Sequence, residues 1–306
     1  MTHINASNIE RLVPVLPPKD KKLRLLLDTD AANEVDDLYA VALALVSPDR
    51  FHIEGFVTTH FAASAGPESG NRSYSLILQL LQAAGVGGKY PVKRSAHPMQ
   101  YLTQPSEGEG VDFIIERAYC GSEEDPLWVV GLGAATHLAS AVLKDPNIIP
   151  RVRYVFHARS EMTWPERSVQ FNVKGDVMAV RALLKSEVPL VWFDTGTNLV
   201  ASFEDTEKHI ATTGPLGRFI HEYRRNNPKW MTTSKGFFDL GDIAWMIEPE
   251  LCISEIVPAP AMDQCMYFDH SKSNGNMLRI YDINNEATWK LFYGRMKENA
   301  TKIRLN

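Results

Sequence analysis

Short apolar runs alternate with segments of helical periodicity along most of the chain. Residues 23–27 (LRLLL) form a compact, mostly apolar run that ends at an aspartate, and runs this short are typical of strands buried on both faces of a sheet. From Val35 to Leu45 the apolar residues recur at the helical spacing instead, until Ser47 and Pro48 end the segment. The first two predicted elements are therefore a buried strand and a helix.

The same alternation continues towards the C-terminus. The further elements it predicts are strands at 51–59, 90–93, 127–132, 152–156 and 189–193, and helices at 74–84, 112–119, 135–143, 176–184, 217–225, from 242 and from 285. Alternating strands and helices are typical of parallel sheets. We therefore predict an α/β fold, in which a single domain has a mostly parallel central sheet flanked by helices.

The first 22 residues differ from the rest in their polar character. They contain charged residues and two prolines but no apolar core, so they do not resemble a signal peptide. We predict that residues 1–22 are an N-terminal lead-in and that residues 23–306 form one domain. No apolar run reaches the roughly 18 residues that cross a bilayer, which argues against a membrane protein.

The net charge and the cysteine content limit which partners the protein can have and in which cellular compartment it is expected. Lys and Arg number 32 and Asp and Glu 37, so the net charge is −5, which argues against a nucleic-acid partner. The three cysteines are far apart and none has a C-x-x-C neighbour, so neither a zinc knuckle nor a redox pair is indicated. Free thiols suit a reducing compartment, and we predict a cytoplasmic protein.

The most informative segment is an acidic run between the first predicted strand and helix. Residues 28–37 (DTDAANEVDD) contain four aspartates and one glutamate. Asp28 and Asp30 lie two apart on an extended backbone and can face the same side, while Asp36 and Asp37 begin a helix, whose dipole favours negative charge there. The carboxyl ends of strands line the ligand crevice of open α/β sheets. Repulsion among these carboxylates calls for a cation, and oxygen ligands suit Ca²⁺ or Mg²⁺.

Two other interpretations of the acidic run are open from the residues alone. The carboxylates can be solvated loop charges in front of an ordinary helix, although the preceding strand has no polar residue after Arg24. A phosphatase of the haloacid dehalogenase type also places a D-x-D after a buried strand and binds Mg²⁺. That family has Thr or Val two residues after its second aspartate, where this chain has Ala32, and it has no use for a second aspartate pair.

Together with three later motifs, the acidic run resembles the inosine-uridine-type nucleoside hydrolases. Their opening motif is DTDPGxDD, and DTDAANEVDD matches both acidic halves, with two extra residues between them and without the Pro-Gly. Residues 133–139 (GAATHLA) resemble the family's GPLTNLA, and residues 170–176 (QFNVKGD) resemble its EFNxxxD. Residues 241–242 (GD), ahead of Glu-Pro at 248–249, resemble its closing HDP-type motif, so that the resemblance covers residues 23–255 in order.

The resemblance implies a calcium-dependent hydrolase that cleaves the N-glycosidic bond of a ribonucleoside to free base and ribose. Asp30 would be the general base on the attacking water, and Asp36 and Asn172 would hydrogen-bond the ribose. Cleavage of an N-glycoside passes through an oxocarbenium-like sugar, which a carboxylate-rich pocket stabilises. The family also implies a homodimer or homotetramer. The implied Ca²⁺ ligands are Asp30, Asp37, Asp242 and the main-chain carbonyl of Thr136.

The residue that would protonate the leaving base departs from the family pattern. Many members carry a histidine immediately before the closing aspartate, which protonates the leaving base, and this chain has Gly241 there. We predict that the acid has moved, and the candidates are His60, just after the second predicted strand, and His157, just after the strand at 152–156. The alternative is that no acid acts and that bases which leave easily are preferred.

The side that would bind the sugar's 5′ end also differs. Gln170 replaces the family's glutamate and loses its charge, and residues 162–166 (MTWPE) replace a loop that carries an asparagine near the 5′-hydroxyl. Trp164 and Glu166 of this segment are candidate substrate contacts, although packing is the more common role for such a tryptophan. Asn71 is a candidate sugar-contacting asparagine beyond the second strand.

Two further hypotheses concern turnover and access. A non-catalytic riboside-binding homologue is the main alternative to an enzyme: the missing histidine favours it, and the retained Asp30 opposes it. Residues 224–230 (RRNNPKW) are basic and polar, and they form either a solvated loop or a lid that excludes water when a nucleoside binds.

Overall fold

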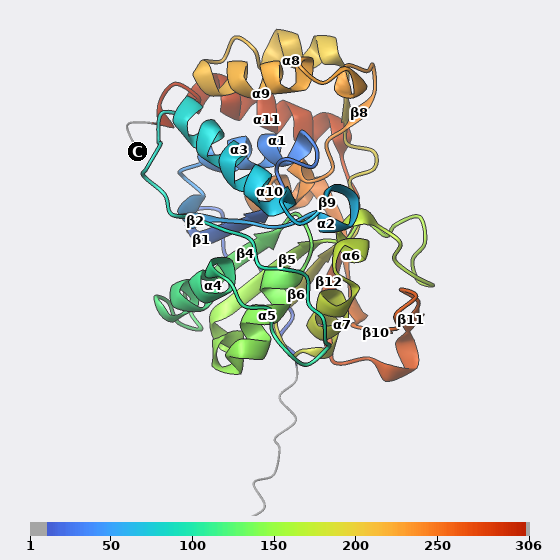
Figure 1. The fold of residues 1–306 in the computed structure, drawn as a ribbon. Coiled ribbons are helices and arrows are strands. Elements are labelled where there is room, and N and C mark those ends of the chain that lie inside the picture. Colours follow the sequence, from blue (N-terminus) through green and yellow to red (C-terminus); the bar gives the residue numbers. More distant parts are fainter. Residues whose placement is uncertain (1–10, 304–306) are drawn as a thin grey trace, which may run out of the picture.

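The computed structural model describes residues 11–303, which are built on one eight-stranded sheet (Figure 1). Neighbouring strands pair in parallel, except that β9 runs antiparallel to β12 at one edge. The predicted α/β fold with a mostly parallel sheet is confirmed. In spatial order the strands are β3 (Val92–Lys93), β2 (Phe51–Thr58), β1 (Leu23–Thr29), β4 (Leu127–Gly131), β5 (Val152–His157), β6 (Leu190–Phe193), β12 (Asn276–Ile283) and β9 (Cys252–Pro258).

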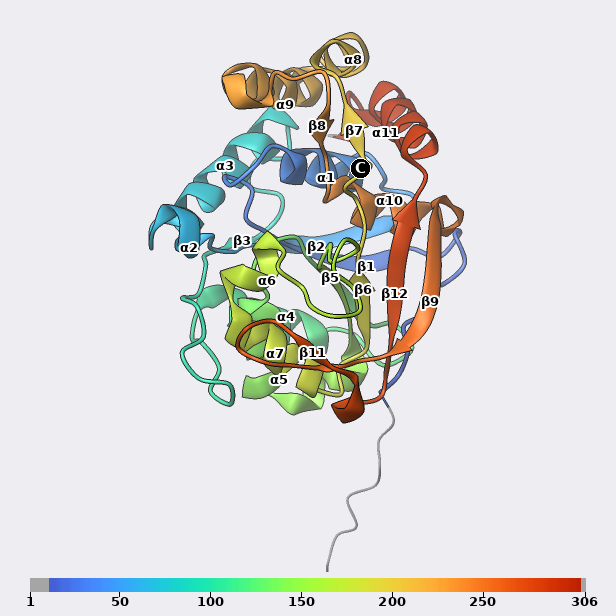
Figure 2. The same ribbon diagram turned by 90° about the vertical axis from the view of Figure 1, so that its right-hand side faces the viewer.

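Helices cover both faces of the sheet, and the two views in Figures 1 and 2 agree on which lie where. The helices over one face are α1 (Asp36–Leu45), α3 (Ser69–Ala83), α9 (Pro215–Arg225), α10 (Leu240–Ile247) and α11 (Asn285–Asn299), with α8 (Phe203–His209) outside them. Those over the other face are α4 (Glu109–Tyr119), α5 (Thr136–Lys144) and α7 (Val177–Lys185). The shorter elements are α2 (Ala62–Ala65), α6 (Phe171–Gly175) and the two-stranded pairs β7 (Val200–Ala201) with β8 (Lys235–Gly236) and β10 (Ala261–Met262) with β11 (Phe268–Asp269).

The strand order places a crevice at the centre of the sheet. β2 lies on one side of β1 and β4 on the other, so the direction in which the sheet grows reverses at β1. Ligands bind beyond the carboxyl ends of strands at such a switch point. Gly133, just after β4, allows a close approach there, because a Cβ at this residue would lie 2.9 Å from the Cβ of Asp30. The acidic run that follows β1 therefore lies at the crevice.

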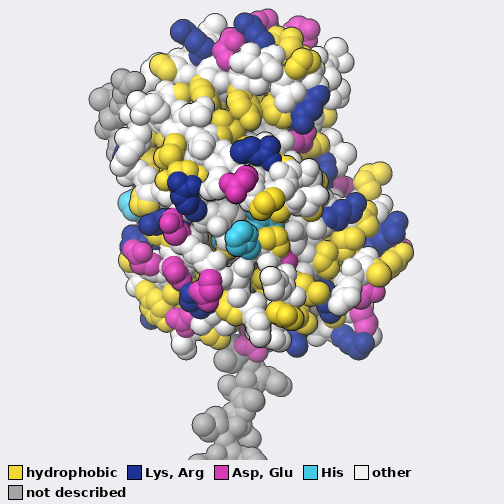
Figure 3. Space-filling view, viewed as in Figure 1, with side chains coloured by type: hydrophobic (Ala, Val, Ile, Leu, Met, Phe, Trp, Pro, Cys, Tyr) yellow, Lys and Arg dark blue, Asp and Glu magenta, His cyan; other side chains and the backbone are white. Residues whose placement is uncertain are grey.

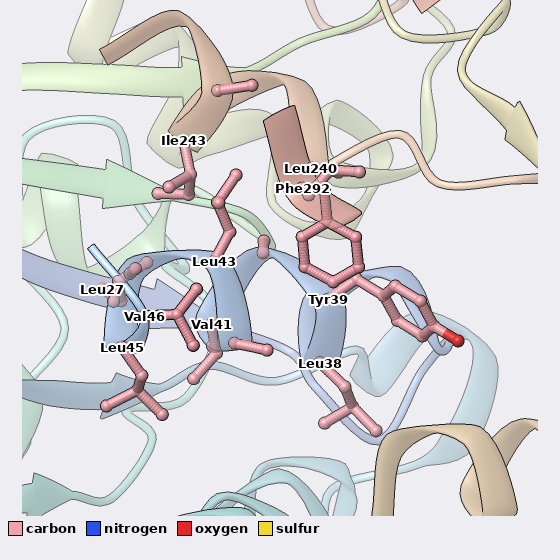
Figure 4. Close-up of a cluster of buried hydrophobic side chains, with 14 of the residues drawn as sticks. Leu27, Leu38, Tyr39, Val41, Leu43, Leu45, Val46, Leu240, Ile243 and Phe292 are labelled. Atoms are coloured by element: carbon pink, nitrogen blue, oxygen red, sulfur yellow. The ribbon is translucent and has the colours of Figure 1, made fainter. Parts of the chain in front are cut away.

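Helix α1 is fixed in place by packing on every side. All its residues are buried, and Figure 4 shows its side chains packed against α10 and α11, with Leu43 near Ile243 and Tyr39 near Phe292. Burying a side chain such as that of Leu43 contributes about 1.5–3 kcal/mol to the stability of the fold, relative to leaving it exposed. This packing holds rigid the first turn of α1, which carries Asp36 and Asp37.

The segment ahead of the sheet packs onto the domain at Arg11. Its guanidinium donates hydrogen bonds of 3.0 Å to the carbonyl oxygens of Leu183 and Leu184 at the end of α7. β1 begins at Leu23, and residues 1–10 of the predicted lead-in lie outside the described residues. Among the helices of residues 11–303, none combines the length and the apolar character that a bilayer crossing needs.

One face of the molecule shows how its charges are distributed. In Figure 3 the Lys and Arg side chains are interspersed with those of Asp and Glu over this face. A protein that binds nucleic acid gathers Lys and Arg into a patch or stripe. The face in Figure 3 therefore does not have the charge pattern of a nucleic-acid-binding surface.

Candidate functional site

A cavity of about 290 Å³ lies beyond the carboxyl ends of β1, β4 and β5. Pockets that enclose small ligands typically begin near this size. Its residues come from both halves of the chain, from the acidic run after β1 and from the segment before α10. The lining residues are Asp30, Asn33, Glu34, Asp36, Asp37, Leu132, His157, Gln170, Phe171, Asn172, Lys229, Phe238 and Asp239.

Four carboxylates form the acidic end of the pocket floor. Asp30, Asp36, Asp37 and Asp239 are each at most 5% exposed. Carboxylate oxygens of the last three lie within 4.8 Å of one another. Asp30 Oδ2 and Asp36 Oδ1 are buried without a hydrogen-bond partner among the described residues. Because leaving a buried acceptor unpaired costs about 1–3 kcal/mol, this end of the floor is suited to a ligand that pairs these oxygens.

Two helix N-termini bring these carboxylates together. Asp36 and Asp37 are the first two residues of α1, and Asp239 immediately precedes α10. The backbone N–H of Phe238 donates a hydrogen bond of 3.1 Å to Asp36 Oδ2, which joins the two helix starts. The Thr29 hydroxyl donates to Asp37. Helix N-termini favour negative charge, which partly offsets the repulsion within the cluster.

The remaining repulsion is visible in the pKa values of the cluster. Burial, and then the neighbouring carboxylates, raise the pKa of Asp30 and that of Asp239 well above the ordinary value for aspartate. Burial and Asp36 raise the pKa of Asp37 to about 8. Without a cation Asp37 therefore retains a proton at neutral pH, and a divalent cation would relieve the repulsion within the cluster directly.

The donor set fits a hard metal ion. Asp36, Asp37 and Asp239 form one group of three with ligand atoms close enough to hold an ion, and His157, Asp239 and Asp242 form another. Only the first is made entirely of oxygen ligands, the type that Ca²⁺ and Mg²⁺ prefer. Asp30, with its unpaired oxygen, lines the same pocket.

The amides of Asn172 and Gln170 and the imidazole of His157 also line the pocket, with His157 Nδ1 3.7 Å from Asp239 Oδ1. Asn172 donates through Nδ2 to the carbonyl oxygens of Leu132 at 2.7 Å and His157 at 3.2 Å, so its Oδ1 is free to accept. The side-chain oxygen of Gln170 accepts a 2.7 Å hydrogen bond from the Asn172 backbone N–H and begins α6, so its amide nitrogen is free to donate. These two residues lie in the pocket as the sequence predicted, and both can bind hydroxyl groups.

The structure contradicts the expected ligand role of the Thr136 carbonyl. Thr136 is the first residue of α5, so its carbonyl is directed along that helix, and its hydroxyl donates to Asp176 at 2.7 Å. Thr136 does not line the pocket, whereas Leu132, which precedes the helix by four residues, does. The correction follows from where β4 ends: the chain turns away from the crevice before it reaches the threonine.

Asp242, an expected calcium ligand, does not line the pocket itself, but it belongs with His157 and Asp239 to the second group that could hold an ion. Asp242 lies in the first turn of α10, fully buried, and accepts a 2.7 Å hydrogen bond from His157 Nδ1. Asp239, three residues earlier, lines the pocket instead. The residue before the lining aspartate is therefore Phe238 rather than Gly241, and a phenyl ring has no proton to give to a leaving base. No local signal in the sequence separates the two aspartates, since Asp239 precedes α10 without a side-chain capping hydrogen bond.

The two candidate histidines lie in different surroundings. His60 does not line the pocket; its Nε2 bonds the Thr136 hydroxyl at 2.8 Å, and burial lowers its pKa to about 4. Both facts contradict its expected role as the leaving-group acid. His157 does line the pocket, where it is 1% exposed on the floor.

Three candidate substrate contacts lie outside the pocket. Asn71 is on the outer surface of α3, where its side chain bonds Glu68 at 2.6 Å and Arg94 at 2.9 Å. Trp164 packs against the ring of Phe268, with ring centroids 5.2 Å apart. Glu166 is exposed and does not line the cavity. The structure therefore contradicts all three expected contacts: α3 begins earlier than predicted and carries Asn71 outwards, and Trp164 has a packing role.

The mouth of the pocket carries charged residues that the sequence analysis did not assign. Glu34, from the two-residue insertion, is 35% exposed and pairs with Lys235 at 3.4 Å, and Lys229 is exposed over the ring of Trp230. Of residues 224–230 only Lys229 lines the pocket. Arg224 is buried and donates a 2.8 Å bond to the Trp230 carbonyl, so both ends of the segment are anchored. The segment is thus a fixed wall, which does not favour the lid hypothesis.

Comparison with known proteins identifies the family. The model of the family described as inosine-uridine preferring nucleoside hydrolase matches residues 25–296. This chain belongs to that family. The pyrimidine-specific ribonucleoside hydrolase RihA of Escherichia coli strain SMS-3-5 is 26% identical over 260 residues, which are 75% of this chain and 81% of the relative.

Solved structures show the same fold. A plant nucleoside hydrolase, PpNRh1, superposes with a TM-score of 0.71 at 16% identity, over 91% of this chain and 100% of that one. A purine-preferring ribonucleoside hydrolase from Gardnerella vaginalis has a TM-score of 0.70 at 16% identity, over 91% of this chain and 99% of that one.

Membership of the family decides between the alternatives drawn from the sequence. This nucleoside hydrolase is an N-glycosyl hydrolase, so the prediction of an enzyme is confirmed, and the interpretation as a haloacid-dehalogenase-type phosphatase is wrong. The resemblance of the chain to the inosine-uridine-type nucleoside hydrolases is likewise confirmed.

Proposed function

We propose that this pocket hydrolyses the N-glycosidic bond of a ribonucleoside to free base and ribose, with one Ca²⁺ bound at its acidic end. The observation that carries the proposal is the buried floor, where Asp30 and Asp36 present unpaired oxygens beside Asp37 and Asp239. The ligands in this proposal are Asp30, Asp37, Asp239 and the main-chain carbonyl of Leu132. The homodimer or homotetramer and the cytoplasmic location stay predictions from the sequence.

The residues of the pocket floor have different roles: some bind the ribose hydroxyls, and one takes a proton. Asp36, through Oδ1, and Asn172, through Oδ1, accept hydrogen bonds from ribose hydroxyls. Asp30 takes the proton from the attacking water through its unpaired Oδ2. The surrounding carboxylates stabilise the positive charge that develops on the sugar as the glycosidic bond breaks.

The remaining roles in the proposed reaction belong to the cation and to the residues at the mouth of the pocket. Asp30, Asp37, Asp239 and the Leu132 carbonyl would hold the Ca²⁺, whose positive charge would relieve the repulsion among the carboxylates and lower the pKa of the nucleophilic water. The base projects towards the exposed mouth, which Glu34, Lys229 and Phe238 line. Because Phe238 cannot protonate it, we expect cleavage to depend steeply on how well the base leaves, with a p-nitrophenyl riboside cleaved fast.

A nucleoside panel tests the proposal. Purine and pyrimidine ribonucleosides are incubated with the protein in calcium, and both the free base and the reducing sugar are measured. We expect equal amounts of the two products from at least one nucleoside, and none when a chelator removes calcium. Binding of nucleosides without release of either product would support the non-catalytic alternative and contradict the proposal.

Removal of the metal should make stability fall as the pH rises. Asp37 has a pKa of about 8 in the folded protein and an ordinary value of 3.8 when unfolded, so the folded state holds more protons between these values. Stability then falls as the pH rises through this window, because deprotonation favours the unfolded chain. His60, with its pKa lowered from 6.5 to about 4, acts in the opposite sense only below about pH 6.5.

Thermal unfolding measures this effect without interference from His60. We expect the melting temperature of chelator-treated protein to fall between pH 6.5 and pH 8.5, and saturating calcium to remove most of the fall. In an Asp37→Asn variant the fall should be smaller, since that group no longer titrates. A melting temperature that rises over this range in the chelated protein would contradict the assignment.

A further inference from the structure

A second cavity, of about 950 Å³, lies at the other end of the sheet from the acidic pocket. Lys22 immediately precedes β1, Phe51 begins β2 and Tyr90 lies two residues before β3, so the cavity is at the amino ends of these strands. Because the three strands are parallel, their amino ends lie away from the carboxyl ends that border the acidic pocket. Small-molecule sites typically have volumes of about 300–1,000 Å³, so this cavity is large enough for an organic ligand.

Positive side chains from four parts of the chain converge on this second cavity. They come from before β1, from before β3, from α11 and from just after α11, and they are Lys22, Lys89, Arg295 and Lys302. Among the lining residues the only carboxylate is that of Asp49, which accepts a hydrogen bond from Arg295. The three lysines are exposed and form no ion pair within residues 11–303. In a chain whose net charge is −5, the cavity is therefore a local region of positive charge.

This concentration of positive charge indicates an anionic ligand. A cleft lined by charge of one sign focuses the electric field and raises the local concentration of oppositely charged ligands. Lysine and arginine are also the side chains that bind phosphate oxygens through charge-assisted hydrogen bonds. A phosphate monoester carries about two negative charges and three terminal oxygens, so it offers an acceptor to each of the three lysines. A carboxylate offers one charge and two oxygens, and matches this set of cations less well.

The rest of the cavity wall is apolar and aromatic, which indicates a ligand with an organic body. Leu45, Phe51 and Ile53 are buried residues of α1 and β2 that border the cavity. The ring of Tyr90 is half-buried, and the ammonium group of Lys89 lies 5.3 Å from its centroid. An inorganic ion would leave this wall in contact with water, whereas the body of an ester would cover it and gain from the burial of apolar surface.

We propose that the second cavity is a binding site for a phosphate monoester with an aromatic body, which is the chemistry of a nucleoside monophosphate. The phosphate group binds the lysines, and the aromatic body lies against the wall that Tyr90 and Phe51 form. The site is separate from the acidic pocket, and its occupancy does not depend on the proposed reaction.

Calorimetry with 2′,3′-dideoxyadenosine 5′-monophosphate tests the site in the calcium-loaded protein. This probe lacks the vicinal hydroxyls that the acidic pocket would bind, so its binding reports on the second cavity. We expect one site per chain with a dissociation constant below about 1 mM. Inorganic phosphate and 2′,3′-dideoxyadenosine each have only one of the two parts, and both should bind at least about tenfold more weakly. The absence of saturable probe binding would overturn the proposal, as would inorganic phosphate that binds as tightly as the probe.

Two sets of lysine substitutions locate the bound probe. The test protein has Lys22→Gln, Lys89→Gln and Lys302→Gln together. The control protein carries the same change at three exposed lysines that do not line the cavity, which are Lys185, Lys208 and Lys290. Both proteins lose three positive charges, so the general attraction of the surface for anions falls equally. All six lysines are exposed, so both proteins should fold, and thermal unfolding verifies this.

The two proteins should differ in their affinity for the probe. We expect the test protein to bind it at least about tenfold more weakly than the parent, and the control protein to stay within about twofold. Equal losses in both proteins would show that the overall charge attracts the probe, and parental binding by the test protein would place the probe elsewhere; either result would overturn the proposal. These measurements need no turnover, whereas failure of the proposed function would appear as no free base from any nucleoside in the panel.

Discussion

Replacing Asp30 by Asn should abolish turnover while leaving the fold intact. The side chains are nearly the same size, but the amide cannot take a proton from water and carries no charge for the metal. Loss of a general base costs about 10²–10⁴-fold in rate. The expected result is therefore a fall of at least about 100-fold in kcat for ribose release, measured at saturating calcium.

The control for this variant is a change at an exposed aspartate. Asp49 lies far from the pocket, pairs with Arg295 and is 60% exposed, so Asp49→Asn should keep parental kcat. Equal melting temperatures of the two variants in calcium would show that both are folded. An Asp30→Asn rate within a few-fold of the parent would show that another group takes the proton.

Replacing Asp239 by Asn should weaken calcium binding far more than the same change at Asp242. Asp239 lies on the pocket floor beside Asp36 and Asp37, whereas Asp242 bonds His157 beneath it. We expect the dissociation constant for calcium to rise by at least about tenfold for Asp239→Asn, which corresponds to about 1.4 kcal/mol. For Asp242→Asn we expect a change within a few-fold. Calorimetric titration of the chelator-treated proteins measures both.

This pair of variants is well matched, because both side chains are buried at the start of α10 and Asp239 makes no side-chain capping hydrogen bond that the change would remove. A loss of affinity through disruption of α10 would appear in the melting temperature of the metal-free Asp239→Asn protein. The opposite order of affinities, with Asp242→Asn the weaker binder, would restore the ligand set implied by the sequence motifs.

The central sheet could be predicted from the sequence because its strands are buried on both faces. β1, β4, β5 and β6 are fully buried and appear in the sequence as short apolar runs. The antiparallel edge was not predicted. β9 is exposed on both faces, with Ile253 51% and Ile256 62% exposed, so no single face marks it as a strand. Its pairing with β12 depends on tertiary contact rather than on local pattern.

The first half of the site could be predicted for a local reason. Asp30, Asp36 and Asp37 lie within eight residues, between a strand and a helix, so their proximity follows from the chain itself. The second half comes from α10, 200 residues later, and there the sequence offers two aspartates three residues apart. Which of the two aspartates faces the crevice depends on where α10 begins and how it packs. Only the structure shows that it is Asp239.

The wrong contacts have a common origin. Asn71 and His60 are suggested by their place after the second strand, and Trp164 by the family loop that its segment replaces, but neither argument includes the path of the chain in between. A helix that begins at Ser69 turns Asn71 outwards, and the β11 segment covers Trp164. His60 is drawn under the crevice by the Thr136 hydroxyl. Side-chain direction after a strand end is set by such packing, which short motifs do not record.

The central claim is that the acidic floor acts in nucleoside cleavage only with calcium bound. The most direct test is the rate of ribose release from a cleaved nucleoside as free calcium is raised in a chelator buffer. The account predicts no release without calcium, and a rise that saturates when one ion per chain is bound. Release at the full rate in excess chelator, with the protein free of metal, would contradict it.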